Sequence, residues 1–507
     1  MPNSVDLSGR PFHFIGIGGI GMSALAYILA KRQLPVYGSD IRANHITQRL
    51  QDLGAHIFWN QKASNLDEFK NHNRDRQRPD FSTGESGSSL AASLATPEGQ
   101  PTPKVADCLP QVICSSAIDP TNEEYRAALE LGCPIFHRSD LLAALIQEYQ
   151  SIAIAGTHGK TTTSSMVGFV LLRSGLDPTI VVGGEVKAWD GNARLGRGKH
   201  LIAEADESDG SLVKFAPKIG TIVNIELDHP DRYANLDEVV DIFHTFANRC
   251  EILVGCWDCP VVRERFDPQI RYSLDPKSGA EYTVDMVAYN AGGTTARVWE
   301  RGKVLGNLKL GVLGKHNLSN ALAAVAIARS LEIEFAAIAD ALADFEGARR
   351  RFELRGRANG IWFIDDYAHH PSEIQATLAA ARLRVGTENQ SPKRVVAIFQ
   401  PHRYSRTQTF LSEFASSFGD ADVVVVSDVY GAGESKVEAF GGERVARAIS
   451  ERHRQVNYWP TLDRIETGLQ EVLQPGDFVI FLGAGNLNQV IPKAVEFHRQ
   501  VEFSGAL

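Results

Sequence analysis

Short apolar runs alternate with stretches of helical pattern along most of the chain. Phe12–Ile17 and Gln111–Cys114 read as buried strands, and Gly21–Arg32 reads as a helix. Alternation of this kind predicts parallel sheets joined by crossover helices, and therefore an α/β fold. Further strands are predicted at Pro35–Gly38, Ser151–Ala155, Leu201–Ala205, Thr221–Ile225, Ile361–Ile364, Arg394–Phe399, Val423–Ser427 and Phe478–Phe481, and further helices at Thr162–Ser174 and Asn317–Ser330.

The length of 507 residues corresponds to roughly three domains. We place the domains at residues 1–149, 150–348 and 349–507, with Gly347–Arg351 as the second linker. An insertion at about residues 70–105 interrupts the first domain. Within it, 14 of the 24 residues of Phe81–Lys104 are Ser, Thr, Gly or Pro, a composition that predicts a flexible surface segment.

Composition excludes several classes of protein. The hydrophobic share of 43% and the charged share of 22% are those of a globular chain, and the net charge of −9 gives no reason to expect a nucleic-acid partner. Six cysteines are too few for a disulfide scaffold. The apolar stretch Phe12–Ala30 contains four glycines that suit a turn better than a membrane span, so we expect a cytoplasmic protein without a membrane partner.

A glycine-bearing turn follows the strand at Ser151–Ala155, with the residues Gly156, Thr157, His158, Gly159, Lys160, Thr161 and Thr162. Backbone N–H groups of such a turn and the following helix N-terminus bind phosphate oxygens. Lys160 would add positive charge near the β- and γ-phosphates, and the Thr161 hydroxyl would reach Mg²⁺. Ile154 stands where the usual motif has its first glycine, so the match is to a shorter G-x-x-G-K-T pattern.

A second glycine motif, Gly16-Ile17-Gly18-Gly19-Ile20-Gly21, follows the first strand. Asp40 lies 19 residues past Gly21, at the end of the next strand, as in a dinucleotide-binding fingerprint. The pyrophosphate of any nucleotide diphosphate fits the same helix N-terminus. Two phosphate sites in two domains are therefore expected, one for a nucleotide-linked substrate and one for ATP.

Polar clusters follow several predicted strands, where ligand crevices form in open α/β sheets. Glu204–Asp209 and Asn224–His229 offer carboxylates and an imidazole that suit Mg²⁺ bridging phosphates. Asn317 and Asn320 share a helical face and would pair with adenine, the alternative being a helix cap. In the last third, the clusters Asp365–Pro371, Gln400–Thr407 and Asp428–Glu434 suggest one crevice wall, in which Arg403 and Arg406 would bind one carboxylate.

These motifs resemble those of the Mur ligase family, from Gly16 to about Gly485. The segments that carry the resemblance are GIGGIGMS, AGTHGKTTT, AEADESDGS, NIELDHPD, GKHNLSNALAA, DDYAHHP, QPHRYSRT and DVYGAGE. The resemblance implies a Rossmann-like first domain, a central ATP-binding domain with a phosphate loop and a Rossmann-like third domain. It also implies an ATP- and Mg²⁺-dependent ligase of peptidoglycan precursor synthesis, acting as a monomer or homodimer. Such an enzyme joins L-alanine to the carboxylate of UDP-N-acetylmuramate through an acyl phosphate.

The resemblance also implies roles for individual residues. Lys160, His229 and His369 are the candidate catalytic residues, and Thr161, Glu204 and His229 the metal ligands. ATP would contact Gly156–Thr162, His316, Asn317, Asn320, Arg351 and Asp365. The UDP substrate would contact Gly18, Gly19, Gly21, Met22, Ser23, Asp40, Ser115, Ser116, His137 and Arg138. L-Alanine would contact Tyr367, His369, Arg403, Arg406 and Tyr430, with His402 assisting the same loop.

Three alternatives stay open at this point. A sister ligase attaches a recycled tripeptide to the same UDP sugar and would need a roomier pocket beside Arg403 and Arg406. An NAD-dependent dehydrogenase would use Gly16–Gly21 but leaves the phosphate loop unexplained. A phosphate-loop module that regulates a partner would turn over ATP without any amino acid.

Overall fold

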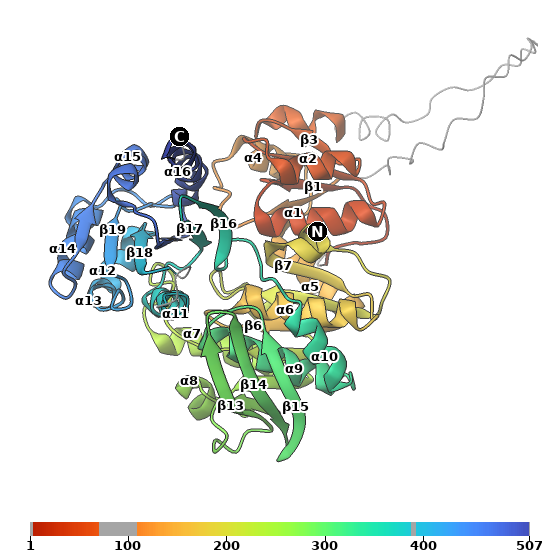
Figure 1. Ribbon diagram of the computed structural model, residues 1–507. Helices are drawn as coiled ribbons and strands as arrows, with labels where there is room; N and C mark the ends of the chain where they lie inside the picture. The colour runs from red at the N-terminus through yellow and green to blue at the C-terminus, as the bar shows by residue number, and fades with distance from the viewer. Residues whose placement is uncertain (1–3, 70–108, 387–391, 506–507) are drawn as a thin grey trace, which may run out of the picture. The chain divides into compact units, whose positions relative to one another are not determined.

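The computed structural model describes residues 4–69, 109–386 and 392–505, which form two compact units, Met1–Leu145 and Ile146–Leu507 (Figure 1). The predicted insertion at about residues 70–105 lies outside the described residues. The described residues form three sheets, one in the first unit and two in the second, as expected for an α/β protein. Among the described helices, none has both the length and the apolar character that crossing a bilayer requires.

The first unit contains one fully parallel sheet with strand order β3-β2-β1-β4-β5. Its strands are β1 (Phe12–Ile15), β2 (Val36–Ser39), β3 (His56–Phe58), β4 (Gln111–Cys114) and β5 (Ile135–His137), and its helices are α1 (Ile20–Lys31), α2 (His45–Asp52), η1 (Ala63–Leu66), α4 (Glu123–Glu130) and α5 (Arg138–Glu148).

The second unit begins with a ten-stranded sheet of order β15-β14-β13-β12-β11-β10-β6-β9-β7-β8. Its strands are β6 (Gln150–Ala155), β7 (Thr179–Val186), β8 (Gly191–Arg194), β9 (His200–Ala205), β10 (Ile219–Ile222), β11 (Ile252–Cys256), β12 (Ile270–Ser273), β13 (Tyr282–Asn290), β14 (Gly293–Glu300) and β15 (Lys303–Leu310). Its helices are α6 (Lys160–Arg173), η3 (Lys187–Trp189), η4 (Ser211–Lys214), α7 (Leu236–Ala247), α8 (Pro260–Arg265), α9 (Lys315–Ser330) and α10 (Phe335–Ala343).

Helices α6 and α9 are buried along most of their length and pack against each other. Alanines in α9 allow this close approach, and alanine is also the best helix former. The antiparallel strands β13, β14 and β15, green in Figure 1, extend the parallel part of the sheet.

The third sheet has the order β16-β17-β21-β18-β19-β20. Its strands are β16 (Glu353–Ala358), β17 (Ile361–Asp366), β18 (Arg394–Phe399), β19 (Val423–Val426), β20 (Val456–Tyr458) and β21 (Asp477–Leu482), and its helices are α11 (Pro371–Arg382), α12 (Tyr404–Thr409), α13 (Leu411–Ala415), η5 (Glu438–Phe440), α14 (Gly442–Ser450), α15 (Leu462–Val472), η6 (Leu487–Val490) and α16 (Ile491–Gly505). The first strand of this domain was predicted at Ile361–Ile364, whereas the structure has the antiparallel strand β16 before it. That strand has mostly exposed and half-buried residues, so it lacks the apolar run on which the prediction relied.

A buried polar network connects several elements of the first unit. Glu124 on α4 is fully buried, and its Oε1 lies 2.7 Å from Nε2 of the equally buried His13 on β1. Ser39 Oγ donates to Glu124 Oε2 at 2.5 Å, and Asn65 Nδ2 donates to Oε1 at 2.9 Å. One carboxylate therefore holds two strands, a helix and the η1 turn in register.

We expect Glu124→Ala to destabilise the first unit by about 3–5 kcal/mol, because it leaves buried polar partners unsatisfied. Urea unfolding of the full chain, followed by a probe in the first unit, measures the change. The matched control is Glu123→Ala, which removes the exposed neighbouring carboxylate and should cost less than about 1 kcal/mol. Equal effects of the two substitutions would contradict this account.

Candidate active site

The phosphate loop lies between β6 and α6, and its glycines are required sterically. Gly156 has φ +145°, and a Cβ there would lie 2.3 Å from Val223 Cγ2. Gly159 has φ +81°, and its Cβ would lie 2.7 Å from Asn320 Oδ1. Asn224, just past β10, holds the loop by accepting from the His158 N–H at 2.8 Å and donating to its carbonyl at 2.9 Å.

The N-terminus of α6, which carries the positive end of the helix dipole, lies at this loop. No described side chain caps that helix, so the positive end of its dipole is available to an anion. Lys160 stands at the first position of the helix. Its Nζ donates to the carbonyls of Gly156 and Thr157 at 2.7 and 3.0 Å and contacts Glu207 Oε2 at 2.7 Å. Burial lowers the pKa of Lys160, but the carboxylates of Glu207, Asp206 and Glu204 outweigh burial and raise it, so the ammonium is charged.

Two of the expected metal ligands lie together beside this loop. Thr161 Oγ1 is 3.1 Å from Glu204 Oε1, and Glu204 Oε2 accepts from the Gly183 N–H at 2.7 Å. His229 has other neighbours: its Nε2 lies 3.4 Å from Asp228 Oδ2. Burial lowers the pKa of His229 to about 4, so the imidazole is neutral near pH 7.

A cavity of about 240 Å³ adjoins the phosphate loop. Both amides expected to contact adenine, Asn317 and Asn320, line it together with His316. Asn317 Nδ2 donates to the Leu313 carbonyl at 2.7 Å, and Asn320 Oδ1 accepts from Thr163 Oγ1 at 3.1 Å, so both amides are held in place. The remaining lining residues include the expected His158, Gly159, Thr162 and Arg351, and in addition Glu226, Asp366, Ser372 and Glu373.

Asp366, rather than the expected Asp365, lines this cavity. The two residues are consecutive on β17, and successive side chains of a strand point to opposite faces. Asp365 is 1% exposed and lies 3.2 Å from Arg355 and 3.5 Å from Arg350. Burial raises the pKa of Asp366 to about 6, although Arg351 opposes the shift. Sequence spacing alone could not choose between the neighbours, because the choice depends on the register of one strand.

The residues expected to receive an amino acid lie on loops of the third sheet. Tyr367 and His369 follow β17, and their rings meet edge to face at a centroid distance of 5.6 Å. Tyr430 is exposed and stacks on His402 at 5.8 Å. Burial lowers the pKa of His402 to about 2, so its ring is neutral. Arg403 has φ +66°, a strained value for a residue with a Cβ.

Arg403 and Arg406 do not share a carboxylate in this structure. Arg406 is 1% exposed, and its Nε lies 2.8 Å from Asp228 Oδ1. Arg403 NH1 lies 2.7 Å from Asp231 Oδ2. Burial opposes ionisation of Asp228, but the Arg406 guanidinium and His369 hold the pKa of its carboxyl well below the usual range. Two ion pairs therefore join the loop after β10 to the loop after β18. The Arg406–Asp228 pair is buried, and the Arg403–Asp231 pair is partly exposed.

The glycine turn of the first unit also has the expected local geometry. Gly18 N donates to Asp40 Oδ2 at 2.8 Å, and a Cβ on Gly18 would lie 2.8 Å from the same oxygen. Arg138 lies beside Gly21, whose added Cβ would be 3.3 Å from NH1. Met22 and Ser23 are buried in α1, and the Ser23 N–H donates to the Gly19 carbonyl at 2.8 Å. Ser115 and Ser116 follow β4, and His137 ends β5 beside α5.

Three residues of the site received no individual role from the sequence. Glu207 and Asn224 lie in the predicted clusters Glu204–Asp209 and Asn224–His229; in the structure Glu207 pairs with Lys160, and Asn224 holds the phosphate loop. Glu373, which contacts both His158 and His369, was not predicted. Glu373 did have a local signal, because a carboxylate three residues after a helix cap forms a capping box. Its position beside two histidines depends on tertiary packing and has no such signal.

Comparison with known proteins identifies the chain's relatives. Models of the Mur ligase family match residues 11–150 (catalytic domain), 154–328 (middle domain) and 350–485 (glutamate ligase domain). A protein of Nostoc punctiforme named UDP-N-acetylmuramate--L-alanine ligase is 62% identical over 495 residues, 98% of each chain. A protein of the same name from Synechococcus elongatus is 57% identical over 502 residues, again 98% of each chain.

Solved structures agree with these matches. The structure of UDP-N-acetylmuramate-alanine ligase MurC from Thermotoga maritima is similar with a TM-score of 0.75 at 27% identity, covering 98% of this chain and 100% of that one. A murein peptide ligase from Psychrobacter arcticus has a TM-score of 0.67 at 20% identity, covering 97% and 99%. At 20% identity, the similarity to the murein peptide ligase supports a shared fold and no more.

We expect Asp228→Ala to lower the apparent free energy of unfolding by about 3–5 kcal/mol, because the buried Arg406 charge loses its partner. Asp231→Ala, which releases the more exposed Arg403, should cost about 1 kcal/mol or less. Urea unfolding of the two variants beside the parent chain measures both changes. If the two substitutions cost the same, Asp228 does not carry the buried contact assigned to it.

Proposed function

The chain belongs to the Mur ligase family, and from that premise we propose that it uses ATP to join L-alanine to the carboxylate of UDP-N-acetylmuramate. The observation that carries this proposal is the extent of the likeness: relatives with this activity in their name are about 60% identical over 98% of the chain. The product would be an early peptidoglycan precursor. A cytoplasmic location is part of the proposal, because the reaction consumes ATP.

A carboxylate has a poor leaving group and must be activated before an amine can attack it. We propose that a carboxylate oxygen of the UDP substrate attacks the γ-phosphorus of ATP, which releases ADP and forms an acyl phosphate. The amine of L-alanine then attacks the acyl carbon and loses a proton, and inorganic phosphate leaves with the transferred carboxylate oxygen. Catalysis of the first step consists mainly of positioning and charge stabilisation.

The phosphate loop supplies the groups for that step. Lys160 is charged, and its Nζ is held by two loop carbonyls and by Glu207. When ATP binds, phosphate oxygens would replace Glu207 as the anionic partner of Lys160. Thr161 and Glu204 offer hard oxygen donors 3.1 Å apart, a set that fits Mg²⁺. Bound there, Mg²⁺ would neutralise phosphate charge. His229 is neutral, so its lone pair can serve a metal ion or accept the proton that the amine loses.

The nucleotide would occupy the cavity beside the loop. His316, Asn317 and Asn320 border it from α9, Arg351 from the segment before β16, and Asp366 from the end of β17. Tyr367, His369, Arg403, Arg406 and Tyr430 remain proposed contacts of the amino acid, and the glycine turn with Asp40 the proposed contact of the UDP group. A dehydrogenase is not favoured, because it leaves the phosphate loop and Glu204 without a role.

The proposed reaction predicts which substrates release phosphate. ATP and UDP-N-acetylmuramate should yield phosphate with L-alanine well above every other amino acid in a panel and above the L-Ala-γ-D-Glu-diaminopimelate tripeptide. Lys160→Met should reduce the rate by about 10²-fold or more, because it removes a charge that stabilises the transferring phosphoryl group. The control Lys187→Met changes an exposed lysine that pairs with Glu346 and should leave the rate unaltered. Preference for the tripeptide would instead identify the recycling ligase.

The raised pKa of Asp366 predicts a pH dependence of nucleotide binding. Above about pH 6 the carboxyl is ionised and both of its oxygens accept hydrogen bonds; below that value it is protonated, so it loses its charge and one oxygen becomes a donor. The affinity for an ATP analogue should therefore fall as pH decreases through about 6, and calorimetric titration from about pH 5 to about pH 8 measures it. Asp366→Asn should bind more weakly and lose this dependence, whereas Asp365→Asn should keep it. The reverse pattern would return the assignment to Asp365.

A further inference from the structure

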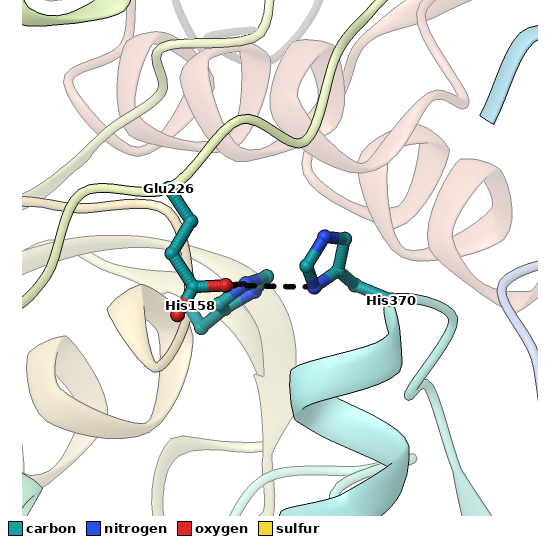
Figure 2. Close-up of side chains that lie close together, drawn as sticks. All are labelled: His158, Glu226 and His370. Carbon is teal, nitrogen blue, oxygen red and sulfur yellow. Dashed lines mark ion pairs between the residues drawn. The ribbon is translucent and has the colours of Figure 1, made fainter. Parts of the chain in front are cut away.

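Three side chains with metal-binding chemistry, His158, Glu226 and His370, lie close together (Figure 2). The first two line the cavity beside the phosphate loop. His158 belongs to the phosphate loop and Glu226 to the loop after β10. His370 is the residue that directly precedes α11. Each offers one ligand atom, and the three atoms lie within 4.8 Å of one another. The pair Thr161 and Glu204, proposed above for Mg²⁺, is a separate set of residues.

The separations suit a small tetrahedral ion. Glu226 Oε2 lies 3.4 Å from His158 Nε2 and 3.7 Å from His370 Nδ1. Bonds of about 2.0–2.1 Å in tetrahedral geometry place ligand atoms roughly 3.3–3.4 Å apart, and both separations from Glu226 are within a few tenths of an ångström of that value. The ligand atoms of the two histidines lie within 4.8 Å of each other, so these rings would approach when an ion binds. Two imidazoles with one carboxylate favour Zn²⁺, Co²⁺ or Ni²⁺ over Mg²⁺ or Ca²⁺, which prefer oxygen ligands.

The two imidazoles have different surroundings. His370 is 4% exposed, and among the described residues its Nε2 is buried without a hydrogen-bond partner. His158 lies between the carboxylates of Glu226 and Glu373, which outweigh burial and raise its pKa to about 10, so a bound ion would replace a proton on this ring. The Ser372 N–H reaches His370 Nδ1 only at 3.3 Å, a long hydrogen bond that an ion would replace. Glu373 Oε1 lies 3.3 Å from His158 Nδ1, where a carboxylate commonly orients a metal-bound imidazole.

We propose that His158, Glu226 and His370 bind one Zn²⁺-class ion, and that the bound ion opposes nucleotide binding. The cavity of about 240 Å³ is small beside ligand pockets, which have volumes of about 300 Å³ or more, and this favours widening of the cavity when ATP binds. Widening separates the phosphate loop from α11, because the cavity lies between them. An ion held by His158 and His370 resists that separation.

Cobalt(II) is the probe for the binding step. Untagged, EDTA-treated full-length chain is titrated with CoCl₂, and the visible absorption of tetrahedral Co²⁺ is recorded. We expect one ion per chain, displaced by ZnCl₂, and at least a tenfold loss of affinity in Glu226→Gln and in His370→Asn. Asparagine can keep the cap of α11, and thermal unfolding verifies that both variants fold. The control His244→Asn changes a histidine that stacks on Phe266 and should bind as the parent chain does.

Absence of a one-equivalent tetrahedral signal, or parent-like binding by both Glu226→Gln and His370→Asn, would overturn the site.

The effect on nucleotide is tested separately, by binding of a non-hydrolysable ATP analogue in excess Mg²⁺ with and without ZnCl₂. We expect Zn²⁺ to weaken analogue binding at least tenfold in the parent chain and not in His370→Asn, which also controls for Zn²⁺ bound by the analogue in solution. Equal weakening in both proteins would overturn the opposition to nucleotide. Failure of the analogue to bind with or without Zn²⁺ would instead count against the proposed ATP site and leave the cobalt result standing.

Discussion

The carboxyl ends of three neighbouring parallel strands, β10, β6 and β9, determine the geometry of the candidate site. The phosphate loop leaves β6, Asn224 follows β10 and holds that loop, and Glu204 near the end of β9 meets Thr161. The arrangement requires close approach, since any side chain at Gly156 would collide with Val223. Every further contact proposed for ATP depends on this edge of the sheet.

Each buried cation of the site has a carboxylate partner within the protein. Lys160 contacts Glu207, Arg406 contacts Asp228, and His158 lies between Glu226 and Glu373. Burial raises the free energy of an unpaired charge by several kcal/mol, so each cation needs a carboxylate until a substrate supplies negative charge. An anionic ligand would therefore replace these carboxylates as the partners of the cations, rather than enter a site whose charges are unpaired. For this reason the arginines expected to bind substrate, Arg403 and Arg406, form ion pairs with Asp231 and Asp228.

Features that depend on local sequence could be predicted closely. The strands at Gln111–Cys114 and Arg394–Phe399 have the predicted bounds, because apolar runs between polar turns mark buried strands. Features that depend on register or on distant packing could not. Asp365 and Asp366 differ only in the face of β17 to which they point, and the ion pairs of Arg403 and Arg406 join segments more than 170 residues apart. Strand β16 was not predicted because its sequence lacks an apolar run.

The central claim is that the phosphate loop transfers the terminal phosphoryl group of ATP to a substrate carboxylate. The most direct test uses UDP-N-acetylmuramate with ¹⁸O in both carboxylate oxygens, incubated with ATP, L-alanine and the full-length chain, followed by mass spectrometry of the released phosphate. The account predicts one ¹⁸O atom in the phosphate and one in the new amide. Phosphate free of ¹⁸O would show that ATP was hydrolysed by water without activating the carboxylate, and would contradict the account.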